Sequence, residues 1–129
     1  MLRSMASQQN QTDSLQQLGA SQRARQAAAY GFSAGKQGDR ASAERYFDVA
    51  FSAASDAWDH RFPGQDGTAL IEEVSSAAAH IDPVAALGRA QRLPEPSAQA
   101  ISMLAVAQVV LARQDASHAP PRASASASR

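Results

Sequence analysis

Hydrophobic residues recur at steps of three and four along the middle of the chain. One such stretch covers about residues 40–60 and contains Ala43, Tyr46, Phe47, Ala50, Phe51, Ala54 and Trp58. A second covers about residues 68–80 and contains Leu70, Ile71, Val74, Ala77 and Ala78. Because an α-helix turns once every 3.6 residues, this spacing gathers the apolar side chains on one side of a helix. The pattern predicts two amphipathic helices.

An earlier helix is bounded by signals at both ends. Asp13 or Ser14 can cap its start, and a glycine-containing turn at residues 36–39 ends it near Gly35. Gly19 can break this helix into two pieces. The carboxylate at position 39 can cap the helix that follows, so the sequence predicts a tight helix–turn–helix at this point.

Proline and glycine mark the remaining boundaries. Residues 62–67 contain one proline and two glycines and predict a loop. The Asp-Pro pair at 82–83 predicts the start of a fourth helix, because proline is tolerated in the first turn. That helix is expected to reach about residue 92, and the Pro-Glu-Pro sequence at 94–96 separates it from a fifth helix at 97–113.

Composition supports an all-α fold of about five antiparallel helices. The 129 residues include 30 alanines, 16 serines and 13 glutamines, whereas aromatic residues make up only 5%. Alanine and glutamine favour helix, and the residues that fill sheets are scarce. Residues 1–12 and 114–129 are polar or low in complexity, so we expect disordered segments around a helical domain at 13–113.

Charge and cysteine content limit the classes of partner. Twelve basic residues balance twelve acidic ones, so the chain lacks the positive surface that nucleic acid or anionic lipid attracts. No cysteine is present, which excludes disulfides and thiolate metal sites. No apolar run near the start resembles a signal peptide, and none is long enough to span a bilayer. We therefore expect a soluble, cytoplasmic chain without a nucleic-acid or membrane partner.

Residues that could form a catalytic or metal site are few. Glu72, Ser76 and His80 share one helix face, but a polar exposed stripe explains that spacing without a nucleophile. The Trp-Asp-His-Arg sequence at 58–61 places neighbouring side chains about 100° apart on a helix, so they cannot converge. Glu73 and His80 are too far apart in sequence for a tight pair of zinc ligands. We expect no enzyme activity, no metal and no cofactor.

The turn-and-helix segment recurs 43 residues later, where Ile81 and Asp82 correspond to Gly38 and Asp39. The first copy resembles a tetratricopeptide repeat in a set of residues at the spacing of that family: Tyr30, Gly31, Lys36, Gln37, Gly38, Asp39, Ala43, Phe47 and Ala50. The offset exceeds the ~34 residues typical of the family, and an inserted turn at 61–67 accounts for the difference. The resemblance covers about residues 24–112 and implies a short α-solenoid.

The resemblance also implies a concave groove lined by the first helix of the hairpin. Arg25, Ala28, Phe32 and Lys36 occupy the ligand-facing positions of the family. By that likeness Arg25 and Lys36 would contact an acidic peptide, and Phe32 would hold an apolar side chain. The alternative left open is that Phe32 packs against the second helix or the loop at 62–66.

The last helix is apolar on nearly every side. Positions 100, 101, 103–107 and 109–112 are all hydrophobic, and such a helix must be covered all round. Self-association through residues 97–113 with two-fold symmetry is one solution, and a central place among the other helices is the alternative.

The sequence therefore predicts a non-catalytic helical-repeat scaffold that binds a protein or peptide. The alternative is a structural remnant, or an assembly subunit, of a longer helical array without a ligand site of its own.

Overall fold

The computed structural model describes residues 19–58 and 65–118, and these form five α-helices without a strand. The helices are α2 (Ala20–Lys36), α3 (Arg40–Ala57), α4 (Gln65–Ile81), α5 (Pro83–Gln91) and α6 (Pro96–His118). The predicted all-α class is confirmed.

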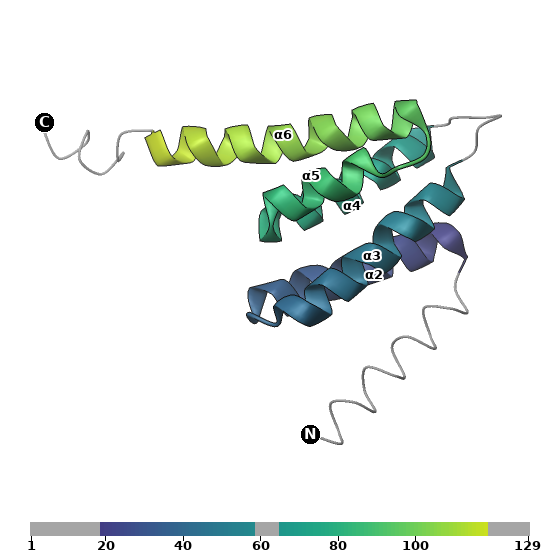
Figure 1. The fold of residues 1–129 in the computed structure, drawn as a ribbon, viewed down its shortest axis with the longest axis horizontal. Coiled ribbons are helices and arrows are strands. Elements are labelled where there is room, and N and C mark those ends of the chain that lie inside the picture. Colours follow the sequence, from purple (N-terminus) through teal and green to yellow (C-terminus); the bar gives the residue numbers. More distant parts are fainter. Residues whose placement is uncertain (1–18, 59–64, 119–129) are drawn as a thin grey trace, which may run out of the picture.

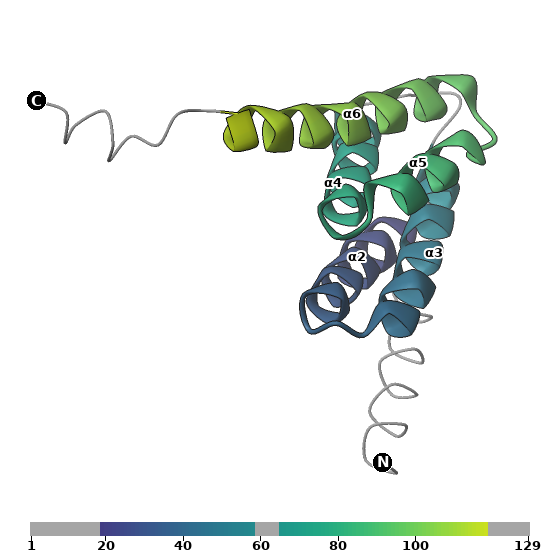
Figure 2. The ribbon, with the colours of Figure 1, turned by 60° about the vertical axis from the view of Figure 1, so that its left-hand side comes forward.

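The helices stack in chain order (Figure 1). An α2–α3 hairpin lies at one end, the α4–α5 pair packs on it, and α6 lies across the far side of that second pair. Helix α4 is the common neighbour, because it contacts each of the other four described helices. The turned view in Figure 2 shows the same order, with the C-terminal part of α6 extending past α4 and α5.

The α2–α3 turn follows the predicted capping pattern. Gly38 has a φ of 83°, a left-handed conformation that a residue with a side chain rarely adopts. The next residue, Asp39, accepts a hydrogen bond from the Ser42 backbone N–H at 3.2 Å and so caps α3. Hydrogen bonds from the side chain and the backbone of Ser42 lower the pKa of Asp39 below its usual value. The predicted turn and cap are both confirmed.

Small residues allow the helices to approach closely. Alanine accounts for thirteen of the twenty-two buried hydrophobic residues in the described part of the chain. At Gly31, a β-carbon would lie 3.1 Å from the ring of Phe47, so the absence of a side chain gives this ring its place between α2 and α3. Many of the larger members of the core come from α3 and α4, among them Phe47, Phe51, Leu70, Ile71 and Val74. Both predicted apolar stripes face this core.

Helix boundaries differ from the sequence expectations in three places. Helix α3 ends at Ala57 rather than near residue 60, and the backbone N–H of Trp58 closes its last turn. Helix α4 begins at Gln65, so part of the predicted loop at 62–67 is its first turn, and residues 59–64 lie outside the described chain. Helix α6 reaches His118 instead of residue 113, because no helix-breaking residue occurs before Pro120.

Some expectations concern residues outside the described chain. The proposed caps at Asp13 and Ser14, the segment 1–12 and residues 119–129 all belong to this group. Gly19 is the N-cap residue of α2, and its backbone is extended. Over residues 19–58 and 65–118, no helix has both the length and the apolar character needed to cross a membrane.

The last helix is not enclosed by the others. Helix α6 packs on α4 and α5 through one side, and Leu104 and Leu111 on its other side are 60% and 57% exposed. Among the described helices, the alternative that α6 is central in the domain is therefore wrong. Its alanine-rich sequence contains two apolar faces, and the described chain covers one of them.

Candidate functional site

The three residues expected to bind a partner lie on the side of α2 that meets α4. Arg25 Nε lies 3.0 Å from Glu73 Oε2, in an ion pair whose two side chains are about half exposed. The Phe32 ring meets His80 edge-on, with the ring centres 6.5 Å apart. Lys36 Nζ lies 5.4 Å from the centre of the Phe32 ring. The structure thus brings these residues into one row along the α2–α4 boundary.

Contacts within the fold already engage two of these side chains. Phe32 is half-buried against the core, and its ring meets His80 of α4, whereas residues 62–64 of the loop named in the alternative lie outside the described chain. Ala28, the fourth position that the resemblance implied, is buried. A partner at this boundary would therefore meet a surface of mixed charge, with Lys36 exposed and Arg25 paired.

The residues of α4 considered for catalysis differ in exposure. Glu72 and His80 are exposed, and Ser76 between them is half-buried. Ser75, the neighbour of Ser76, is buried and its hydroxyl lies 2.6 Å from that of Ser102 on α6. Within the part of the chain that the structure describes, no three side chains are grouped to hold a metal ion. Residues 59–61, considered with Trp58, lie outside that part.

A groove of about 420 Å³ opens between α3 and the turn from α5 to α6. Two buried side chains, Phe51 and Leu93, contribute apolar surface to it, and charged residues of both signs surround them. Its lining consists of Asp48, Phe51, Ser52, Ser55, Asp56, Arg89, Arg92, Leu93 and Pro94. Helix α2 contributes none of these residues, so the groove is distinct from the one that the resemblance implied.

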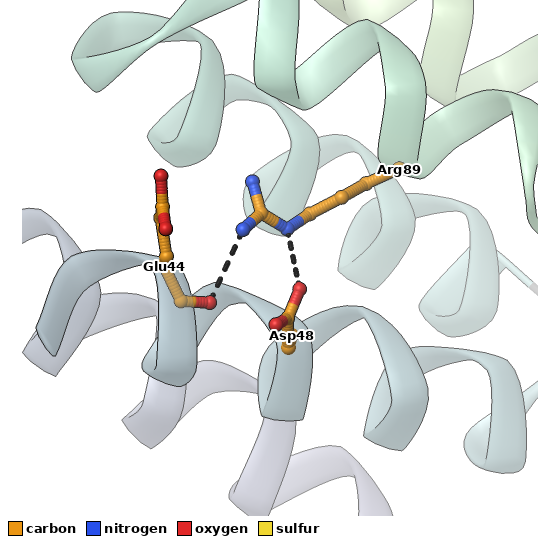
Figure 3. Close-up of polar contacts among 3 residues, drawn as sticks. All are labelled: Glu44, Asp48 and Arg89. Atoms are coloured by element: carbon orange, nitrogen blue, oxygen red, sulfur yellow. Dashed lines mark hydrogen bonds and ion pairs between the residues drawn. The ribbon is translucent and has the colours of Figure 1, made fainter. Parts of the chain in front are cut away.

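Arg89 joins the two walls of the groove (Figure 3). From α5 it donates a hydrogen bond through Nε to Asp48 Oδ1 at 2.9 Å, and through an Nη atom to the backbone oxygen of Glu44 at 3.1 Å. The Arg89 side chain is 9% exposed, whereas that of Asp48 is 66% exposed. Because a guanidinium loses much hydration in such a place, its two acceptors on α3 hold it in position. Arg89 therefore links α5 to α3 at this point.

The remaining charges of the groove are not equivalent. Asp56 forms a longer ion pair with Arg23 of α2, 3.6 Å between the charged atoms. Arg92 is exposed and forms no ion pair with the other described residues. An incoming anion can reach Arg92 without displacing an internal partner, whereas the charge of Arg89 is already compensated.

Sequence reasoning missed this groove. Arg89 and Asp48 are 41 positions apart, and neither belongs to a recognisable local motif. The one usable signal was the Pro94-Glu95-Pro96 sequence, which predicts a sharp turn where Leu93 and Pro94 now form a wall.

Comparisons with protein-family models, with curated proteins and with solved structures find no match to this chain. Its function must therefore be argued from its own geometry.

Proposed function

We propose that the protein is a non-catalytic helical-repeat scaffold that binds a protein segment or peptide. The observation that carries the proposal is the groove between α3 and the α5–α6 turn. It combines apolar surface from Phe51 and Leu93 with the accessible cation of Arg92, and ligand sites commonly pair an apolar pocket with a few polar groups. We therefore expect a ligand that carries a carboxylate beside an apolar side chain.

The order of helix contacts supports the repeat interpretation. Each described helix contacts the next one along the chain, and α4 also contacts α2 and α6 across the layers. Stacked helical hairpins have this kind of neighbour pattern, in which each unit meets only the units beside it. The row of Arg25, Phe32 and Lys36 on α2 is a second candidate surface for the same partner class.

Peptide selection tests the proposal. A display library of random peptides is selected on the full chain, and the affinities of the recovered peptides are measured for wild type and Arg92→Glu. We expect enrichment of Asp or Glu next to an apolar residue, and at least a tenfold loss of affinity for Arg92→Glu. Arg40→Glu is the matched control, because it reverses an exposed charge at the start of α3 outside the groove.

The alternative surface on α2 is tested with the same peptides. Lys36→Glu and Phe32→Ala are expected to bind as wild type does if the groove is the site. If these two variants lost binding while Arg92→Glu had no effect, the binding site would be the α2 surface and not the groove. Failure to recover any peptide above the background of an unrelated helical protein would count against peptide binding altogether.

A second candidate function is that of an assembly subunit. The exposed apolar side of α6, with Leu104 and Leu111 more than half exposed, favours it. The two functions use different surfaces, because no residue of α6 lines the groove.

A further inference from the structure

Helix α6 carries two apolar rows with the same spacing. Five residues of α6 are buried against the rest of the molecule, and four of them form a row at four-three-four spacing, Ala98, Ser102, Ala105 and Val109, with Val106 beside it. Two residues further along, the same four-three-four spacing gives an exposed row of Ala100, Leu104, Ala107 and Leu111, called here the outer row. A shift of two residues turns a helix by about 200°, so the outer row lies opposite the buried one.

The outer row is open over its whole length. Its four members are all exposed, and Met103 beside it is 38% exposed. Figure 2 shows α6 at the edge of the molecule, with the α4–α5 pair along one side only. Residues 97–112 include no charged side chain, so no charge would have to be desolvated when this face meets a second apolar surface.

We propose that the outer row pairs with the outer row of a second copy, in antiparallel orientation about a two-fold axis between residues 105 and 106. Under that symmetry Leu104 of one copy lies opposite Ala107 of the other, and Ala100 lies opposite Leu111. Every layer then contains one leucine and one alanine. The spacing is that of the a and d positions of a heptad, which form a continuous seam between two helices.

A parallel pair would fit less well. It would place alanine against alanine and leucine against leucine in alternate layers, and one helix separation cannot fill both kinds of layer. In the antiparallel pair the two helix dipoles also point in opposite directions, which is favourable. The exposed Asp115 of one copy then lies beside the N-terminal turn of α6 in the other copy, and a negative charge is favoured at a helix N-terminus. Size and charge therefore select the same orientation.

The size of the seam sets the expected strength of association. Sixteen residues of helix span about 24 Å, which gives a contact below the standard area of a stable protein interface. We expect a reversible dimer with a dissociation constant on the order of 10–100 μM. This proposal does not rest on peptide binding in the groove, because the two surfaces share no residue.

Sedimentation of the full chain over a concentration range of 5–500 μM tests the dimer. We expect the mass to rise from 13.5 kDa toward twice that value. The variant with both Leu104→Glu and Leu111→Glu should stay monomeric at every concentration while keeping its helical circular dichroism, since both side chains face solvent. Val84→Glu, which changes an 82% exposed hydrophobic residue on α5, is the matched control and should dimerise as wild type does.

Two results would overturn the dimer. One is a wild-type chain that stays monomeric at 500 μM, and the other is a double glutamate variant that still associates. Growth to trimers or larger species would contradict the two-fold axis, because a pair of self-complementary rows closes after two copies.

Disulfide trapping tests the orientation. The chain has no cysteine, so Ala100→Cys and Leu111→Cys can be made as separate variants, mixed in equal amounts and oxidised under a glutathione buffer. The antiparallel pair brings position 100 of one copy beside position 111 of the other, so the mixed disulfide should exceed the two like-with-like disulfides several-fold. An excess of like-with-like products in mass spectrometry would overturn the antiparallel orientation.

Discussion

The α2–α3 hairpin and α6 use the same small residues with opposite results. In the hairpin, buried alanines and Gly31 bring two helices together around Phe47, so the apolar face of each helix is covered. In α6, small and apolar residues also occupy both faces, but the described chain covers the face with alanine and valine and leaves the two leucines exposed. The apolar content of a helix thus sets how much of its surface favours burial, whereas the number of helices packed around it sets how much of that surface is actually buried.

Truncating one large side chain in each region should give the largest contrast. Phe47→Ala removes a 98% buried ring and leaves a cavity between α2 and α3, at an expected cost of about 3–5 kcal/mol. Leu104→Ala removes an exposed side chain and should change the free energy of unfolding by no more than about 0.5 kcal/mol. Urea denaturation followed by circular dichroism at about 2 μM protein, where the proposed dimer is dissociated, measures both. Equal effects of the two substitutions would contradict the contrast.

The packing of α6 on α4 can be tested at a pair of buried serine hydroxyls, one from each helix. Ser75 and Ser102 are fully buried and lie 2.6 Å apart, so Ser102→Ala leaves the Ser75 hydroxyl without that partner. We expect a loss of about 1–3 kcal/mol for either single alanine variant, and less than the sum of the two losses for the double variant. A double-mutant cycle in urea measures this coupling. Additive losses would show that the two hydroxyls act independently.

The smallest expected effect concerns the acid sensitivity of the hairpin. The pKa of Asp39 is lowered by its hydrogen bonds with Ser42, so its ionised form stabilises the folded state. That contribution is present above the unfolded pKa and is lost as the pH falls through the folded one. Between pH 5 and pH 3, the melting temperature of wild type should therefore fall more steeply than that of Asp39→Asn, which keeps a capping side chain but does not titrate. If the melting temperatures of the two proteins fell equally with pH, the acid sensitivity would not be due to the ionisation of Asp39.

The parts of the fold that depend on local chemistry could be predicted from the sequence. Asp39 and Asp82 cap α3 and α5 as expected, each through a side-chain bond to a backbone N–H three residues later. The apolar stripes of α3 and α4 also face the core as expected. These features depend on residues within a few positions of one another, so a single segment contains the information.

The groove and the exposure of α6 depend on contacts between distant segments. Nothing near Arg89 indicates that its acceptors would be Asp48 and the Glu44 carbonyl, because α3 and α5 meet only after α4 has placed them. Likewise, when a helix is apolar on two sides, the spacing of its hydrophobic residues does not show which side the other helices will cover. The four-three-four spacing of the outer row was nevertheless present in the sequence, two positions from the buried row.

The alanine-rich core has a consequence for how stability should vary with temperature. A methyl group exposes little apolar surface when the chain unfolds, and the heat capacity of unfolding scales mainly with that surface. Thirteen buried alanines therefore predict a heat-capacity increment below the usual ~12–15 cal/mol/K per residue, and so a broad, shallow stability curve. We therefore expect the free energy of unfolding to change little on cooling, and the melting transition to extend over a wide temperature interval.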